Sequence, residues 1–350
     1  MQAPHFKAPG DADRVVLDFI ARSGLISGDA RCVLRRLTGG VSSDIWLAEA
    51  GGRRFCVKRA LPKLKVAADW FAPVERNANE AAWFEVVGRF LPDAVPQVLA
   101  EDASAGAFAM EYLPEPDYPN WKAQLREGIV SVEVAAEVGR RLARIHSVTA
   151  AQAELRTRFA SDAIFHAIRL EPYLLATARV HPELAARLRQ LAEVTANTKL
   201  ALVHGDVSPK NILMGPRGPV FLDAECAWWG DPAFDLAFCL NHLLLKCLWV
   251  PEKTSAYLAA YRALADTYLA GVDWEPADVF ERRTSALLPG LFLARVDGKS
   301  PAEYVTQDRD KDRVRRLAST LLREPVERLV QIADAWSAEL QKDFHGRDDR

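Results

Sequence analysis

The sequence is poor in features that tie a protein to nucleic acid, to a membrane or to an oxidising compartment. Its 350 residues carry 45 basic and 47 acidic side chains, so no excess of positive charge points to nucleic acid or to a membrane surface. Only five cysteines are present and none forms a Cys-x-x-Cys pair, which predicts reduced, packed thiols in a cytoplasmic protein. The first ten residues are interrupted by Pro4 and Pro9 and lack an apolar core, so we expect no secretory signal.

Long hydrophobic runs are also missing. The most apolar stretch, 237–250, contains Asn241, His242 and Lys246, and this pattern indicates a buried helix instead of a membrane span. With 49% hydrophobic and 26% charged residues, the chain has the composition of a globular protein long enough for two lobes with separate cores. We expect a monomer or a homodimer without a nucleic-acid or membrane partner.

The first third of the chain has the pattern of a small α+β lobe. Two amphipathic helices are predicted, over 13–25 and 77–91. Five short runs have the composition of strands: 32–37, 45–49, 55–58, 97–100 and 107–112. The Gly51-Gly52 pair is typical of a hairpin turn between the second and third of these runs.

A mainly helical region follows a proline-rich linker. Amphipathic segments are predicted over 132–146, 165–175, 182–196, 233–248, 253–269, 278–293 and 314–338. Two short apolar runs, 201–203 and 220–222, depart from this pattern and flank a polar loop, as in a small hairpin embedded among helices. The fold class is therefore predicted as α+β, with a small lobe at 1–113 and a larger helical lobe at 114–350.

The chemically informative residues lie in and after that polar loop. The chain reads Leu-Val-His-Gly-Asp-Val-Ser-Pro-Lys-Asn from 202 to 211 and Phe-Leu-Asp-Ala-Glu from 221 to 225. Asp206, Asn211 and Asp223 each follow the polar end of a β-type run. Two oxygen ligands for a hard cation, with a third carboxylate directed at a hydroxyl, are what phosphoryl transfer to an alcohol requires.

These residues, together with Gly-Asp-Pro-Ala-Phe-Asp-Leu-Ala at 230–237, resemble the aminoglycoside phosphotransferase and choline kinase family, a relative of the protein kinases. The resemblance implies a two-lobed protein-kinase-like fold, with ATP and Mg²⁺ in the cleft and a hydroxylated small molecule as acceptor. It implies Asp206 as the catalytic base, Asn211 and Asp223 as the Mg²⁺ ligands, and His204 as the anchor of the catalytic loop.

Other acidic and aromatic residues near the loop are less clearly assigned. Asp235 is expected to cap the following helix or to brace the catalytic loop, whereas the role of Asp231 stays open. Glu225 is a further candidate for the metal. Trp228 and Trp229 either line the acceptor pocket or pack the core. His146 ends a predicted helix without a nearby partner in the sequence, so it is interpreted as structural.

The resemblance also covers the first lobe, which it makes the nucleotide-binding lobe. Gly39 and Gly40 lie between two predicted strands, where they can bring backbone amides close to phosphates. Lys58 ends the third predicted strand, where the kinase architecture places the lysine that holds the α- and β-phosphates. Glu80 is its expected ion-pair partner, with Glu75 and Glu85 as alternatives. The backbone of Met110-Glu111-Tyr112-Leu113 would bind adenine, and Glu111 and Leu113 are its candidate contacts.

Several alternatives remain open. Protein-kinase sequences of the types Gly-x-Gly-x-x-Gly, His-Arg-Asp, Asp-Phe-Gly and Ala-Pro-Glu are absent, which disfavours a protein acceptor. A pseudokinase is the alternative without activity, and a methylthioribose-kinase-like sugar kinase is the alternative within the family. Four basic residues are expected in a region that can face the acceptor, and they favour a neutral or anionic acceptor: Arg282, Arg283, Arg295 and Lys299.

Overall fold

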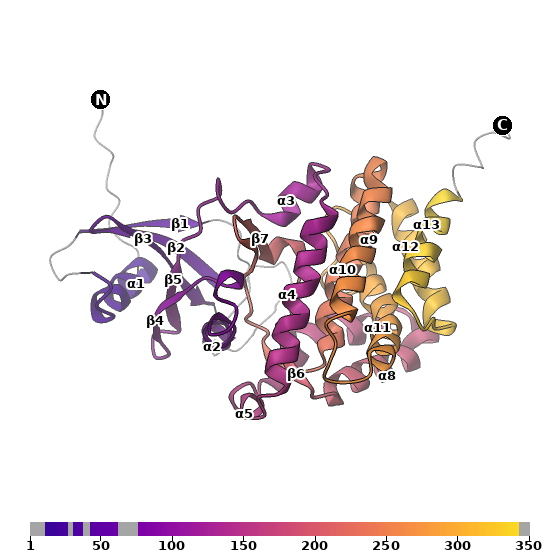
Figure 1. Ribbon diagram of the computed structural model, residues 1–350, viewed down its shortest axis with the longest axis horizontal. Helices are drawn as coiled ribbons and strands as arrows, with labels where there is room; N and C mark the ends of the chain where they lie inside the picture. The colour runs from indigo at the N-terminus through magenta and orange to yellow at the C-terminus, as the bar shows by residue number, and fades with distance from the viewer. Residues whose placement is uncertain (1–10, 27–30, 38–42, 62–75, 343–350) are drawn as a thin grey trace. The chain divides into compact units, whose positions relative to one another are not determined.

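The computed structural model describes residues 11–26, 31–37, 43–61 and 76–342. The chain divides into two compact units, Met1–Pro114 and Glu115–Arg350. The first contains an antiparallel sheet and the second is mainly helical, as Figure 1 shows, so the predicted α+β class is confirmed. Within the described residues, no helix is both long enough and apolar enough to cross a membrane.

A five-stranded antiparallel sheet forms the first unit, in the order β1-β2-β3-β5-β4. Its strands are β1 (Cys32–Leu37), β2 (Ser43–Ala50), β3 (Arg53–Ala60), β4 (Val98–Asp102) and β5 (Ala107–Glu111). Gly51 and Gly52 connect β2 to β3 with φ angles of 56° and 76°, a backbone that favours glycine, and they form the predicted hairpin turn.

Two helices cover the sheet of the first unit, α1 (Asp11–Arg22) and α2 (Arg76–Gly88), and a short 3₁₀ turn η1 (Pro92–Ala94) follows the second. The apolar face of α1 places Val16, Phe19 and Ile20 in one core with Trp46 and Phe55 of the sheet. The first turn of α2 contacts the end of β3, since the side-chain amide of Asn77 donates to the carbonyl of Lys58 at 3.1 Å. This contact ties the helix to the strand that carries Lys58.

The helices and turns of the second unit are α3 (Trp121–Arg126), α4 (Val132–Ala150), α5 (Leu155–Arg158), α6 (Asp162–Phe165), the π-helical segment η2 (His166–Leu175), α7 (Ala176–Val180), η3 (Pro182–Leu184), α8 (Ala185–Asn197), η4 (Pro209–Asn211), α9 (Pro232–Trp249), η5 (Pro251–Lys253), α10 (Thr254–Leu269), α11 (Ala277–Asp297), α12 (Asp308–Arg323) and α13 (Leu329–Gln341). Helix α9 is central, because every residue from Pro232 to Leu248 is buried. Helices α4, α10 and α11 pack against it (Figure 1).

Two predictions about the second unit are wrong in detail. The runs 201–203 and 220–222 do not pair with each other: β6 (Ala201–Val203) pairs with β9 (Trp228–Gly230), and β7 (Ile212–Gly215) pairs with β8 (Gly218–Phe221). The tight turn between β7 and β8 lets them pair locally, which leaves β6 to a strand further along the chain. The helix predicted over 314–338 is two helices, α12 and α13, because Pro325 lies between them.

Candidate active site

The loop that follows β6 is held by one buried carboxylate at the start of α9. The Oδ2 atom of Asp235 accepts a hydrogen bond from the backbone N–H of His204 at 2.7 Å, and Oδ1 accepts from the N–H of Gly205 at 2.8 Å. Gly205 has a φ of 79°, and a Cβ atom there would lie 2.7 Å from the carbonyl oxygen of Cys226. Of the two roles expected for Asp235, the structure therefore shows bracing of the loop.

His204 links this loop to the end of β8. Its Nδ1 atom accepts from the backbone N–H of Asp206 at 3.1 Å, so the ring proton is on Nε2, which lies 3.1 Å from the carbonyl oxygen of Leu222. Burial lowers the pKa of His204, against the opposing charge of Asp235, and a neutral ring fits both hydrogen bonds. The neutral imidazole thus connects the two segments that carry Asp206 and Asp223.

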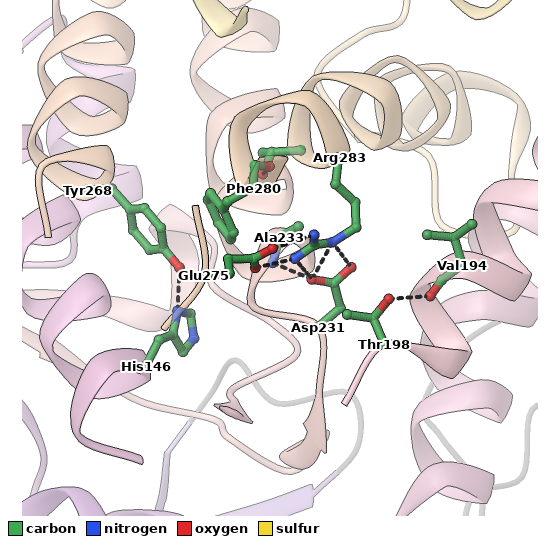
Figure 2. Close-up of polar contacts among 10 residues, drawn as sticks. His146, Val194, Thr198, Asp231, Ala233, Tyr268, Glu275, Phe280 and Arg283 are labelled. Atoms are coloured by element: carbon green, nitrogen blue, oxygen red, sulfur yellow. Dashed lines mark hydrogen bonds and ion pairs between the residues drawn. The ribbon is translucent and has the colours of Figure 1, made fainter. Parts of the chain in front are cut away.

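Behind the loop, His146 supports Asp235 from α4. Its Nε2 atom lies 3.2 Å from Oδ2 of Asp235, and its Nδ1 atom lies 2.6 Å from the hydroxyl of Tyr268 on α10, as Figure 2 shows for the second pair. The interpretation of His146 as structural fits these contacts. Its partners are far away in the sequence, and so sequence reasoning found none.

Asp206 has one carboxylate oxygen engaged by two cations. Its Oδ2 atom lies 2.9 Å from Nη2 of Arg169 and 3.2 Å from Nζ of Lys210, while the residue is only 4% exposed. No donor from the described part of the chain contacts the other oxygen, Oδ1. Arg169 also donates through Nε to the carbonyl of Gly205, so the same side chain holds both the loop backbone and the carboxylate.

Sequence reasoning missed Arg169. It lies on η2, a π-helical segment that contains Pro172, and nothing in the local pattern separates it from a surface arginine of an amphipathic helix. The carboxylate of Asp206 also raises the pKa of Lys210, whose ammonium therefore stays protonated beside it.

The two predicted metal ligands are brought together by the backbone between them. The carbonyl of Asn211 accepts from the N–H of Leu222 at 2.8 Å, which places Asn211 beside Asp223. The side-chain amide of Asn211 donates to the carbonyl of Asp206 at 3.1 Å, and this orientation leaves its Oδ1 as the atom for a cation. Asp223 has a φ of 65°, and no other described residue except glycine has a positive φ.

An amide oxygen and a carboxylate suit Mg²⁺, which keeps its other positions for phosphate oxygens and water. In the described ranges, no group of three or more His, Cys, Asp or Glu side chains lies at metal-binding distance. The donors that converge here are therefore those of Asn211 and Asp223. Glu225, which is buried two positions after Asp223, stays a candidate.

In the first unit, Lys58 forms a buried ion pair. Its Nζ atom lies 2.6 Å from Oε2 of Glu80 on α2, and the two side chains are 3% and 1% exposed. The structure thus shows the pair with Glu80, which was the expected partner, and the alternative Glu75 lies outside the described residues. Such a pair holds the ammonium of Lys58 in one orientation at the end of β3.

The structure says less about the other residues predicted to bind the nucleotide. Gly39 and Gly40 lie outside the described residues. The backbone N–H of Glu111 donates to the carbonyl of Gln97 at 2.9 Å, so only its carbonyl is left for adenine. Leu113 lies beyond the end of β5. Their contacts with adenine stay predictions.

Three of the four basic residues expected near an acceptor are bound to carboxylates instead. Arg283 on α11 clamps Asp231, with Nε 2.9 Å from Oδ2, and its other nitrogens bind Glu275, as Figure 2 shows. Arg282 pairs with Asp278 and Lys299 pairs with Glu171, each at 2.8 Å. The expectation that these three face the acceptor is not supported by these contacts, and Arg295 is the remaining member.

Asp231 has a structural role that the sequence left open. Its Oδ1 atom accepts from the backbone N–H of Ala233 at 3.0 Å and so caps α9. Burial raises the pKa of Asp231, against the opposing charge of Arg283. The first turn of α9 is thereby fixed to α11.

The tryptophans after the metal loop differ in their surroundings. Trp228 is 1% exposed and stacks on Phe165 with ring centroids 4.0 Å apart, so it packs the core. Trp229 is also buried, but it lines a cavity of about 460 Å³ together with Lys199 and Trp274. Nothing in these contacts assigns either ring to an acceptor.

Comparisons with known proteins show the family to which the chain belongs. Residues 33–270 match the model of the phosphotransferase enzyme family, and the chain belongs to this family. Similar curated proteins are the methylthioribose kinases of Erwinia tasmaniensis, 26% identical over 228 residues, and of Bacillus mycoides, 20% identical over 280 residues. The first match covers 58% of this chain and 57% of its relative, and the second covers 70% and 69%. The chain thus spans little more than half of the first relative.

A solved structure shares the fold. An amicoumacin kinase in complex with AMP-PNP and Ca²⁺ is 13% identical, with a TM-score of 0.51 over 92% of this chain and 96% of that chain. The two-lobed protein-kinase-like fold that the resemblance implied is confirmed.

Proposed function

We propose that this protein is a kinase that transfers the γ-phosphoryl group of ATP to a hydroxyl group of a small molecule in a Mg²⁺-dependent reaction. The main support for the proposal is the way in which the carboxylate of Asp206 is held. One oxygen of its carboxylate is held by Arg169 and Lys210, while the other has no donor among the described residues. A carboxylate fixed in this way has one oxygen ready for a hydroxyl proton.

The chemistry follows from these contacts. Oδ1 of Asp206 accepts the proton of the acceptor hydroxyl while the hydroxyl oxygen forms a bond to the γ-phosphorus. The bond between that phosphorus and the leaving oxygen of ADP breaks, and the products are a phosphate ester and ADP. Arg169 and Lys210 keep the carboxylate oriented throughout, because both cations bind Oδ2.

The metal and the nucleotide phosphates each have candidate residues in this chain. Asn211 and Asp223 would hold Mg²⁺, which neutralises the negative charge of the phosphates when it is bound. In the first unit, Lys58 would bind phosphate oxygens, and its pair with Glu80 would keep it in place. The resemblance alone suggests four further nucleotide contacts: Gly39, Gly40, Glu111 and Leu113.

A sugar-derived acceptor is the second candidate within this function, because methylthioribose kinases are among the similar curated proteins. A pseudokinase is disfavoured, since it would be expected to have lost the base, a metal ligand or the lysine. In this chain the pair of Lys58 and Glu80 is formed, and Asp206, Asn211 and Asp223 are all present.

The test replaces Asp206 with asparagine, which keeps the size of the side chain but removes the proton acceptor. Turnover, measured as ADP release with an accepted hydroxyl compound, should fall by a factor of about 100 or more. ATP binding, measured by calorimetry, should be retained. The matched control is Asp334→Asn, which removes a surface carboxylate paired with Arg262. Near-normal turnover of the Asp206 variant would contradict the assignment of Asp206 as the catalytic base.

A further inference from the structure

One face of α9 runs from the catalytic loop to a second group of polar side chains. Asp235 braces the loop, and Phe238, His242, Lys246 and Trp249 follow on the same helix at steps of three or four residues. Asp235 and Lys246 are about 16 Å apart along the axis at the usual helical rise. His242 and Lys246 therefore lie on the same buried face of the helix as Asp235, with Lys246 farther from it.

Buried hydrogen-bond donors without acceptors collect at the far end of this face. Lys246 is 1% exposed, and its ammonium has no hydrogen bond or ion pair within the described residues. His242 is 7% exposed and likewise has no hydrogen bond in the part of the chain that the structure describes. The hydroxyl of Tyr304 and Nε of Arg295 are buried and have no hydrogen-bond partner among the described residues. We refer to Lys246, His242, Arg295 and Tyr304 as the basic cluster.

The rings of Trp249 and Tyr304 are already covered by the amino group of Lys246. Nζ of Lys246 lies 4.1 Å from the ring centroid of Trp249 and 3.9 Å from that of Tyr304, and these two rings stack at 4.3 Å. Faces of tryptophan and tyrosine are the surfaces on which proteins bind ligand ammonium groups. Because Lys246 covers them, this region disfavours a cationic ligand.

The charges of the cluster are not balanced. Glu303 is the carboxylate that acts on Lys246, and it is already paired with Lys122. Burial, together with the charges of Lys122 and Arg295, lowers the pKa of Lys246 to about 6. Burial also lowers the pKa of His242 well below its usual value, and Arg295 and Lys246 act in the same direction. A negative group placed among these side chains would favour their protonated forms and would pair with them.

One member of the cluster, Arg295, shares an aromatic neighbour with the arginine that binds Asp206. Arg169, which binds Asp206, has its Cζ atom 5.8 Å from the ring centroid of Phe238 and 6.0 Å from that of Tyr173. Arg295 approaches the same Tyr173 ring, also at 6.0 Å. The arginine that holds the base and the arginine of the cluster therefore both contact the ring of Tyr173.

We propose that the acceptor is an anion: a hydroxylated small molecule with a carboxylate or phosphate group that Lys246, His242 and Arg295 bind. The proposal rests on the proposed function, because it concerns the acceptor of that reaction. The Tyr304 hydroxyl supplies a further donor. The buried donors then gain an acceptor that the described part of the chain does not provide, and the hydroxyl end of the ligand extends along α9 toward Asp206.

The test measures binding of compounds that share one hydroxylated carbon chain and differ in charge. Glycerol is compared with glycerate and glycerol 3-phosphate, and ribose with ribonate and ribose 5-phosphate, by calorimetry in the presence of a non-hydrolysable ATP analogue and Mg²⁺. Choline serves as the cationic member and inorganic phosphate as the minimal anion. We expect an anionic member to bind at least tenfold more tightly than its neutral counterpart.

Three variants locate the effect. Lys246→Met should reduce the preference for the anion at least tenfold, and Tyr304→Phe should reduce it less while keeping the stack on Trp249. The matched control is Lys199→Met, because that ammonium also lies over an indole ring, at 3.8 Å from the centroid of Trp228, but outside the cluster. It should leave the preference unchanged.

Two results would overturn the inference. One is that the neutral or cationic compounds bind as tightly as the anionic ones or more tightly, or that no anionic compound binds, inorganic phosphate included. The other is an anion preference that survives both Lys246→Met and Tyr304→Phe. ADP release is recorded on the same compounds: turnover without charge preference contradicts only this inference, whereas anion binding without turnover that depends on Asp206 contradicts the proposed function.

Discussion

Replacing Lys246 with methionine should stabilise the ligand-free protein, and the gain should depend on pH. The pKa of Lys246 is lowered from 10.5 to about 6, mainly by burial. Between these two values the unfolded chain binds a proton that the folded chain does not, so the stability of the wild type rises with pH across this window. The destabilisation by Lys246 is therefore largest at pH 6 and below, and it disappears above pH 10.5.

The size of the effect follows from the same shift. One pKa unit corresponds to about 1.4 kcal/mol, so the destabilisation approaches roughly 6 kcal/mol at pH 6 and below. It amounts to roughly 4 kcal/mol at pH 7.5 and roughly 2 kcal/mol at pH 9. Methionine has a similar length and no charge, so it can pack on Trp249 and Tyr304 in place of the lysine stem.

Urea unfolding of the wild type and Lys246→Met at pH 6, 7.5 and 9 measures the difference in the free energy of unfolding. The difference should shrink as the pH rises. Lys199→Met is again the control, because the ammonium of Lys199 is paired with Asp162 near the surface and should show no such trend. A variant less stable than the wild type at every pH, or a gain that is independent of pH, would refute the reasoning.

The remaining predictions concern the metal and the nucleotide. Asp223→Ala should abolish the Mg²⁺ dependence of ATP binding, because alanine cannot replace a carboxylate ligand, and calorimetry with and without Mg²⁺ checks this. The same dependence in variant and wild type would contradict the assignment. Lys58→Ala should weaken ATP binding about tenfold or more, and it should also destabilise the first unit by about 3–5 kcal/mol, because Glu80 is left buried without its cation. The double variant Lys58→Met with Glu80→Leu should recover stability but not ATP binding. If ATP binding were recovered as well, Lys58 would not be a nucleotide-binding residue.

The parts of the site that the sequence predicted are those whose chemistry lies in one short segment. Asp206, Asn211 and Asp223 stand at the ends of neighbouring β-type runs, so their order along the chain already indicates that they meet. Glu80 was named as the partner of Lys58 because it begins the helix after the strand. In both cases the spacing alone limits the geometry.

The parts that were missed depend on contacts between distant segments. Arg169 reaches Asp206 from η2, and the pairing of β6 with β9 skips the hairpin between them. His242 and Lys246 were visible as polar residues in an apolar run, and the run was recognised as a buried helix. Among the described residues, the lack of acceptors becomes visible only when Arg295 and Tyr304, about 50 to 60 positions later in the chain, are brought beside them, and no local pattern reports this.

Helix α9 contributes to two different features of the second unit: its first turn supports the catalytic loop, and its later turns carry residues of the basic cluster. Its first turn is fixed, since Asp231 binds Arg283 of α11 and Asp235 holds the backbone of the catalytic loop. The basic cluster begins two turns later and shares no hydrogen bond with that turn among the described residues. Substitutions that far apart without shared partners usually act independently. A change of charge at Lys246 should therefore alter which acceptor binds while leaving the loop that carries Asp206 in place.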